Sequence, residues 1–202
     1  MGTIEIDERT IDRIDLPPPV QASPATLAQA MAGRRSGRAL RPEALPLAML
    51  SSLLWAAYGF DCRASGGRTA PSLHDWQAID VYAALPDAAY RYDALAHRLC
   101  RVTAEGLCGT IGSQGFVASA PLNLVYVADF ARMHSASPEE RRFLAGADAG
   151  CIAQNVYLFC AGAGLATVLR GRLDREGLAR ALGLARTQRV VLAQSVGYPQ
   201  RA

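Results

Sequence analysis

Residues 151–166 have the sequence CIAQNVYLFCAGAGLA, which predicts a helix that is apolar or small on every face. Its polar groups are limited to Gln154, Asn155 and the hydroxyl of Tyr157. A helix without a polar face has to be buried on all sides. A chain of 202 residues has little material to cover it completely. The stretch therefore indicates a central position in the fold, with a partner subunit as the source of further cover.

The segments on either side of this helix predict a single α+β domain without internal repeats. Alternating apolar residues predict a strand over residues 78–85, with residues 90–92 as its hairpin partner. A continuous apolar run predicts a strand over residues 122–128 that is covered on both faces. Residues 188–196 form the last strand. Helices are expected from Ser23 and Pro24 to about Gly33, over 47–58, 93–99 and 174–182, and from Pro138 to Cys160 or slightly beyond.

The first 22 residues predict an extended arm that precedes the domain of residues 23–202. Pro17, Pro18 and Pro19 stiffen this arm by favouring the polyproline conformation. Residues 60–76 are expected to form a polar loop.

The composition is that of a folded protein that neither binds nucleic acid nor crosses a membrane. Apolar residues make up 50% of the chain and charged residues 19%, which favours folding over disorder. The net charge of +3 lacks the dense basic field of a nucleic-acid binder. No run approaches the roughly 20 apolar residues of a transmembrane helix. The acidic N-terminus is not a signal peptide, although a removed leader stays an open alternative.

The cysteines and histidines predict neither a metal site nor a catalytic triad. Five cysteines without a C-x-x-C pair disfavour a disulfide framework and structural zinc, and they favour a reducing compartment such as the cytoplasm. His74, His97 and His134 lack the spacing of metal ligands. The sequence also lacks a G-x-S-x-G nucleophile motif.

The sequence GRRSGR, residues 33–38, is a candidate phosphate receptor. Arg34, Arg35, Ser36 and Arg38 supply three guanidinium groups and a hydroxyl within five residues. The planar fork of arginine matches phosphate oxygens, and the glycines let the backbone approach a ligand closely. A solvated basic turn is the alternative interpretation.

Two further segments have the composition of binding-site loops. RTAPSLHDWQ, residues 68–77, precedes a strand, where pockets commonly form, although an ordinary loop is equally compatible. GAGLATVLRG, residues 162–171, superficially resembles a dinucleotide-binding motif. That motif follows a strand and opens a helix, whereas this segment closes a long helix and lacks a third glycine. A Rossmann site is therefore excluded.

In their order along the chain, these segments resemble the nitroreductase family, and in particular its short branch with azoline-oxidising dehydrogenases of peptide biosynthesis. The matching motifs are RRSxR at 34–38, RxxPS at 68–72 and GLxTV at 164–168. Smaller matches are LLWAAYG at 53–59, YRYD at 90–93, QNVYL at 154–158 and VGYP at 196–199. The resemblance covers roughly residues 15–199.

The resemblance implies an α+β fold in which helices flank a central, mostly antiparallel sheet. It further implies a homodimer of the domain-swapped type that binds two FMN molecules, each in a pocket built by both subunits. Carried over by position, Arg34, Arg35, Ser36 and Arg38 would hold the phosphate, ribityl chain and pyrimidine edge of FMN. Pro71, Ser72 and Leu73 of the partner chain would line the flavin ring, and Asp75 would lie near its polar edge. Many relatives carry Asn at this last position, and a carboxylate lacks the donor that an amide offers.

The resemblance also assigns the segment that closes the long helix. Val168, Leu169, Arg170 and Gly171 would pass along the flavin, with a backbone N–H directed at its N5 atom. Gln154 and Asn155 either contact the flavin or tie two long helices together. Arg201 would reach the phosphate.

The implied function is an FMN-dependent oxidoreductase. Hydride would pass from NAD(P)H to flavin N5 and then, in a ping-pong cycle, to a small acceptor such as a nitroaromatic compound or a quinone. The flavin carries the chemistry, which is consistent with the absence of a catalytic triad from the sequence. One alternative is a flavin dehydrogenase of the same fold that oxidises azolines and does not use NAD(P)H. A second is a non-enzymatic module that binds a phosphate ligand or a protein through the arginines.

Overall fold

The computed structural model describes residues 12–20, 25–61, 67–112 and 114–200. Its centre is a seven-stranded sheet in the order β1-β6-β5-β4-β7-β9-β8, in which all neighbouring strands are antiparallel. The strands are β1 (Arg13–Asp15), β4 (Ile79–Ala84), β5 (Ala89–Asp93), β6 (Arg98–Thr103), β7 (Leu122–Asp129), β8 (Ala166–Arg170) and β9 (Gln188–Gly197). A small hairpin joins β2 (Phe60–Asp61) to β3 (Gly67–Arg68). The expected antiparallel α+β architecture is confirmed.

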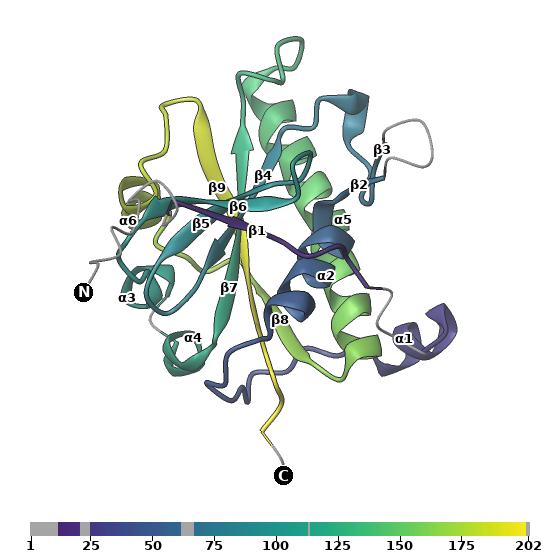
Figure 1. The fold of residues 1–202 in the computed structure, drawn as a ribbon. Helices are drawn as coiled ribbons and strands as arrows, with labels where there is room; N and C mark the ends of the chain where they lie inside the picture. The colour runs from purple at the N-terminus through teal and green to yellow at the C-terminus, as the bar shows by residue number, and fades with distance from the viewer. Residues whose placement is uncertain (1–11, 21–24, 62–66, 113, 201–202) are drawn as a thin grey trace, which may run out of the picture.

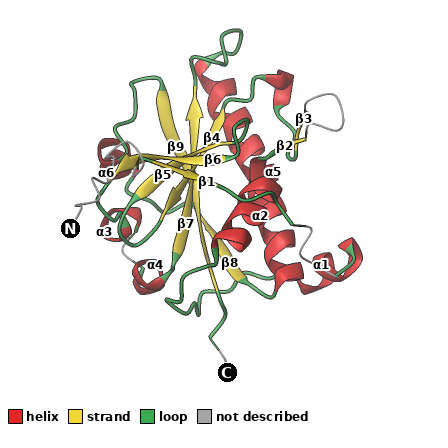
Figure 2. Ribbon diagram, viewed as in Figure 1, coloured by secondary structure: helices red, strands yellow, loops and turns green. Residues whose placement is uncertain are grey.

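Helices cover both faces of the sheet (Figures 1 and 2). They are α1 (Leu27–Gly33), α2 (Leu47–Tyr58), α3 (Cys108–Ile111), α4 (Gly115–Ser119), α5 (Pro138–Ala163) and α6 (Arg175–Ala181), together with a 3₁₀ turn at Leu73–Asp75. The core on one face joins the sheet to α2 and α5, and the core on the other joins it to α3, α4 and α6. Among the described residues, no helix is long and apolar enough to cross a membrane.

The central strand β7 shows why residues 122–128 are uniformly apolar. Leu122, Leu124 and Tyr126 pack into the core beside α2 and α5. Val125 and Val127 alternate with them and pack into the opposite core. Because successive strand residues point to opposite faces, a strand between two cores needs apolar residues at every position. This prediction is confirmed.

Helix α5 begins and ends at the expected signals. The Ser137 hydroxyl accepts a hydrogen bond from Glu140 N, and the Glu140 carboxylate accepts one from Ser137 N. This reciprocal capping box satisfies two N–H groups that the helix cannot pair internally. At the other end Gly164 adopts a φ of 70°, which favours glycine and stops the helix.

Two helix predictions need correction. The first helix has Thr26, not Ser23, as its N-cap, with Gln29 completing a capping box; Ser23 and Pro24 lie outside the described residues. The helix expected over residues 93–99 is wrong, because this segment is the hairpin turn between β5 and β6. The Asp93 carboxylate accepts a hydrogen bond from Ala96 N, and His97 adopts a φ of 49°. Both features favour a turn over a helix.

Five strands were not predicted: β1, β6 and β8 of the central sheet, and the short β2 and β3 within the expected loop of residues 60–76. β1 and β8 form the two edges of the sheet. β8 follows directly after Gly164 and pairs with β9. β1 belongs to the arm and pairs with β6. The arm is also fastened to α2, since Ser51 Oγ donates to Pro17 O and Ser52 Oγ accepts from Val20 N at 3.0 Å. Its first eleven residues lie outside the described part of the chain.

A buried polar cluster connects β7, β8 and β9. The Asn123 Oδ1 atom accepts hydrogen bonds from Arg170 Nη2 at 3.0 Å and from Ser195 Oγ at 2.6 Å. Arg170 Nη1 donates to Ile111 O at 3.1 Å. Asn123 and Ser195 are fully buried and Arg170 is 5% exposed. Burial lowers the pKa of Arg170 to about 10, so the group stays charged at neutral pH and depends on these acceptors.

We expect Asn123→Ala to lower the free energy of unfolding by about 2–3 kcal/mol, because it leaves a buried guanidinium without its side-chain acceptor. The matched control is Asn155→Ala, which removes a half-buried hydrogen bond from Asn155 Nδ2 to Thr69 O at 3.0 Å. That loss should cost about 1 kcal/mol. Urea unfolding measures both. Equal losses in the two variants would contradict the assignment of Asn123 as the acceptor on which Arg170 depends.

Candidate functional site

The segment GRRSGR lies along the outer edge of β8. Ser36 forms a parallel bridge with Thr167, and Gly37 N donates to Thr167 O at 2.9 Å. A Cβ atom on Gly37 would lie 3.1 Å from the Cβ of Ala166, which is tighter than ordinary contact. Glycine thus allows the segment to pass close to the strand. The structure brings two of the predicted segments, 33–38 and 162–171, together.

Tyr157 of α5 fastens these two segments to each other. Its hydroxyl lies 2.8 Å from Ser36 Oγ and accepts a hydrogen bond from Leu169 N at 2.9 Å. The Arg34 guanidinium lies over the Tyr157 ring, 5.2 Å from its centroid. Tyr157 is buried, so these contacts fix the position of Ser36 relative to β8.

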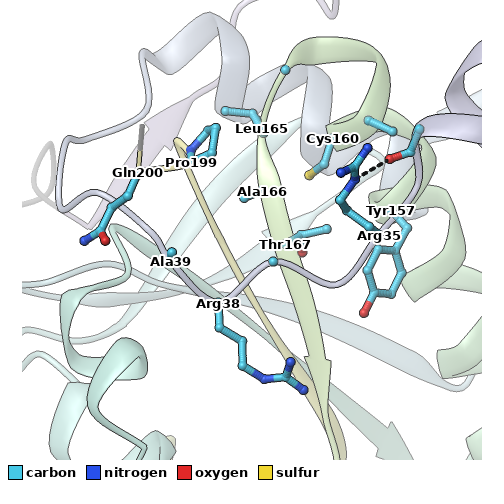
Figure 3. Close-up of a pocket in the computed structure, with 14 residues that line it drawn as sticks. Arg35, Arg38, Ala39, Tyr157, Cys160, Leu165, Ala166, Thr167, Pro199 and Gln200 are labelled. Atoms are coloured by element: carbon cyan, nitrogen blue, oxygen red, sulfur yellow. Dashed lines mark hydrogen bonds between the residues drawn. The ribbon is translucent and has the colours of Figure 1, made fainter. Parts of the chain in front are cut away.

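A cavity of about 410 Å³ opens beside this junction, at the C-terminal end of α5 (Figure 3). Arg35 and Arg38 line it, and their side chains diverge on two sides of the segment (Figure 3). Arg35 Nε donates to Gly33 O at 3.5 Å. Within the described residues neither arginine forms an ion pair. The cavity therefore presents two uncompensated guanidinium groups to a ligand.

The cavity contains a cysteine that is not reactive. Cys160 lines the wall but is only 1% exposed. Burial raises the pKa of its thiol far above neutral pH. A thiol that stays protonated is a poor nucleophile. The site accordingly offers positive charge and shape rather than a nucleophile.

The residues predicted on β8 divide between the two faces of the sheet. Leu169 is half-buried and packs toward α5. Val168 is 2% exposed, and the Arg170 side chain points to the opposite face, where Asn123 and Ile111 O bind it. Arg170 does not line the cavity, and its backbone pairs with β9 at Ala193. Gly171 follows the strand and is exposed.

The loop of residues 71–75 lies elsewhere along α5. Asp148 accepts hydrogen bonds from Ser72 Oγ and from Leu73 N, both at 3.1 Å. Burial raises the pKa of Asp148, and these two hydrogen bonds act in the opposite direction. Tyr157 follows Asp148 by nine helical positions, about 13 Å along the axis. Within one chain this loop therefore does not line the cavity beside Arg35.

Three non-glycine residues in this loop and directly after it lie in the left-handed region. The φ angles are 54° at His74, 52° at Asp75 and 46° at Gln77. The Asp75 carboxylate accepts a hydrogen bond from Gln77 Nε2 at 3.1 Å, and Arg68 Nε donates to Gln77 Oε1 at 2.9 Å. Strained backbone of this kind persists only where surrounding contacts hold it, commonly at ligand sites.

The remaining predicted residues have separate positions. Gln154 is exposed on α5. Asn155 Nδ2 donates to Thr69 O of its own chain and so supports the loop before Pro71. This contact is neither the expected flavin contact nor the expected link between two long helices. Arg201 lies outside the described residues.

Sequence reasoning missed the supporting roles of Tyr157 and Asp148. The sequence pattern of each residue could have indicated its role. Tyr157 places a hydroxyl in an otherwise apolar helix segment, and Asp148 places a carboxylate in a run of small residues, AGADAGC, at 145–151. A lone polar group in a buried helix needs a partner. The partners come from other segments of the chain. Tyr157 binds Ser36 and Leu169 N, and Asp148 binds Ser72 and Leu73 N.

Comparison with known proteins identifies related chains. The model of the nitroreductase family matches residues 31–198. A Methanocaldococcus jannaschii protein assigned to the nitroreductases is 30% identical over 148 residues, which cover 68% of this chain and 74% of that protein. The crystal structure of a Ralstonia eutropha protein, also assigned as a nitroreductase, has a TM-score of 0.89 at 42% identity, covering 95% of this chain and 91% of that one.

A more distant structure shares the fold. It is the NADPH:FMN oxidoreductase of Vibrio harveyi in complex with NAD⁺, with a TM-score of 0.62 at 21% identity, covering 87% of this chain and 69% of that one. The family match spans most of the sequence and includes both segments that meet at Tyr157. The chain belongs to the nitroreductase family.

Proposed function

We propose that this protein is an FMN-dependent oxidoreductase that passes hydride from NAD(P)H through the flavin to a small-molecule acceptor. The observation that carries the proposal is the seating of Arg34, Arg35, Ser36 and Arg38 on β8, beside a cavity of about 410 Å³. Family membership supports an oxidoreductase, and the related Vibrio harveyi protein is an NADPH:FMN oxidoreductase. A reducing compartment such as the cytoplasm fits the free thiols of Cys100, Cys151 and Cys160.

The residues beside the cavity fit the phosphate end of FMN. Arg35 and Arg38 have no ion-pair partner among the described residues, and Ser36 supplies a hydroxyl held by Tyr157. Guanidinium groups bind phosphate through paired, charge-assisted hydrogen bonds. Arg34 stacks on Tyr157 and would add positive charge at a greater distance.

The backbone directly after β8 offers an N–H group to a flavin ring beyond the end of the strand. The backbone C=O of Thr167 and the backbone N–H of Leu169 point away from β9, where they bind Gly37 N and the Tyr157 hydroxyl, respectively. Alternation along a strand turns Val168 and Arg170 toward β9 instead. Gly171 N–H makes no hydrogen bond to another described residue. We therefore assign Gly171 as the donor toward flavin N5.

Bound FMN would supply the hydride chemistry, and the protein would supply orientation and electrostatics. Arg35, Arg38 and Ser36 would anchor the phosphate, β8 would support one edge of the ring, and Gly171 N–H would favour the reduced ring. The strained loop of residues 71–75, held by Asp148, would cover the ring of the partner's site.

A homodimer would explain the uncovered face of α5. Phe143 is 74% exposed, and Ala147, Cys151 and Gln154 are exposed on the same side, at helical spacing. A Cβ atom added at Gly150 would meet nothing within 4 Å. An apolar face of small residues allows two helices to approach closely, and it matches the sequence expectation of cover from a partner.

Purified protein should be yellow and release close to one FMN per chain on denaturation. Under anaerobic conditions, NAD(P)H should bleach the visible flavin absorption, and an added quinone should restore it. Absorption spectroscopy measures both steps. Colourless protein that also fails to bind added FMN would refute the proposal, whereas bound FMN that NAD(P)H does not reduce would support the azoline-oxidising alternative.

Replacing both Arg35 and Arg38 by alanine should weaken FMN binding by about one hundredfold, because two charge-assisted contacts with the phosphate are lost. Binding of riboflavin, which lacks the phosphate, should change by less than about threefold. Flavin fluorescence quenching in titrations of the apoprotein gives both affinities. An equal loss for FMN and riboflavin would show that these arginines do not hold the phosphate.

Introducing a charge on the exposed face of α5 should separate the subunits. We expect Ala147→Glu to shift the protein from dimer to monomer and to reduce its FMN content, because burying an unpaired carboxylate is costly. Ala104→Glu, at an exposed position after β6, is the matched control. Light scattering coupled to size-exclusion chromatography gives the mass. A dimeric Ala147→Glu variant with full FMN content would exclude this face as the interface.

A further inference from the structure

A second cavity, of about 520 Å³, lies at the N-terminal end of α5. Four arginines line it: Arg141 and Arg142 from α5, Arg175 from α6 and Arg189 from β9. We call it the arginine cavity. None of the described residues that line it is acidic. Tyr157 follows Arg142 by fifteen helical positions, which places the two cavities about 22 Å apart along α5.

The arginine cavity combines this charge with an apolar wall. Phe130 and Val191 supply an aromatic and a branched aliphatic side chain, whereas the side chain of the neighbouring Val190 is buried in the opposite core. An apolar surface with a few charged groups at its margin suits an organic ligand better than an inorganic ion. The cavity is thus built for a molecule with a flat or hydrophobic body and negative groups.

Backbone carbonyls, rather than carboxylates, hold the guanidinium groups. The hydrogen bonds run from Arg141 to Met133 O at 2.9 Å, from Arg175 to Gly171 O at 3.0 Å and Val191 O at 3.1 Å, and from Arg189 to Gln188 O at 2.8 Å. Arg142 makes no hydrogen bond to another described residue. Carbonyls orient a guanidinium but leave its positive charge uncompensated.

Elsewhere in the described chain, several arginines are neutralised by acidic side chains. Arg98, Arg101 and Arg132 each form an ion pair with an aspartate. None of the arginines at the cavity has such a partner among the described residues. The nearby Glu140 carboxylate caps Ser137 N at 2.8 Å. Four like charges around one cavity repel each other, and a ligand with several negative charges would relieve that repulsion.

Arg175 connects the arginine cavity to the proposed flavin site. Its Nη2 atom donates to the carbonyl of Gly171, the residue whose N–H we assign to flavin N5. A hydride donor has to place its reactive ring against the flavin near this point. The rest of such a donor would extend beyond the end of β8, where the cavity lies.

We propose that the arginine cavity binds the phosphorylated adenosine end of the hydride donor, which is therefore NADPH rather than NADH. This inference rests on the proposed function. The 2′-phosphate that distinguishes NADPH carries about −1.5 to −2 charges at pH 7, as other phosphate monoesters do. Arg142 and Arg189 are exposed arginines that can bind it, and the wall at Phe130 and Val191 receives the adenine.

The test is calorimetric titration of the FMN-loaded protein with adenosine 2′,5′-bisphosphate and with AMP. The bisphosphate should bind at least about tenfold more tightly than AMP, because its second phosphate adds a charge-assisted contact. The double substitution Arg142→Ala and Arg189→Ala should weaken the bisphosphate about tenfold or more. The double substitution Arg13→Ala and Arg91→Ala makes the same change in net charge at exposed positions outside the cavity and should alter it by less than about twofold.

A second measurement follows the donor itself. In the Arg142 and Arg189 variant, the ratio of KM for NADH to KM for NADPH should fall toward one. The inference would be overturned if the unchanged protein bound adenosine 2′,5′-bisphosphate and AMP with equal affinity. It would also be overturned if the cavity variant and the control variant lost equal affinity for the bisphosphate. Either result leaves FMN binding and reduction by NAD(P)H intact. Because titration requires no turnover, failure of the proposed function would be seen separately, in the flavin spectrum.

Discussion

Helix α5 has to be covered along about 39 Å of its length, and the rest of the molecule is arranged to do this. One side packs on the sheet through Ile152 and Val156, which are fully buried. α2 and α1 cover further parts, and Asp148, Asn155 and Tyr157 bind loops and strand edges. Every functional segment is therefore positioned by the same rigid element. All three polar groups bind predicted ligand-binding segments: Tyr157 binds residues 33–38 and 162–171, whereas Asp148 and Asn155 bind residues 68–77.

This dependence explains which parts of the fold the sequence predicts. Periodicity predicts α2, β4, β7, α5 and β9 within one or two residues, because each has a strong apolar pattern and a clear cap or stop. It fails for β8, whose pairing partner β9 comes later in the chain and whose short segment follows a helix without a break in composition. It fails for residues 93–99, where Asp93 and His97 build a turn within a sequence of ordinary helix formers.

The candidate site shows the same division between local and distant information. Composition identifies Arg34, Arg35, Ser36 and Arg38, because four phosphate-binding groups in five residues are a local feature. It does not predict that Arg170 faces the opposite core, since that depends on the parity of a strand absent from the predicted order. The positive φ values at His74 and Asp75 are equally hidden, because nothing in residue type requires them there.

The two ends of α5 differ in the electrostatic work that anion binding requires. A helix carries partial negative charge at its C-terminus and partial positive charge at its N-terminus. The cavity beside Arg35 includes Gly164, just past the C-terminal end, so the helix stabilises the arginines there but opposes a phosphate. The arginine cavity includes Pro138, the first residue of α5, where the helix repels the guanidinium groups and favours an anion. At the cavity beside Arg35, the attraction of the guanidinium groups for a phosphate must exceed its repulsion by the helix C-terminus. At the arginine cavity, the guanidinium groups and the helix N-terminus both attract a phosphate. After loss of its guanidinium groups, the C-terminal cavity should therefore retain less affinity for a phosphate than the N-terminal one.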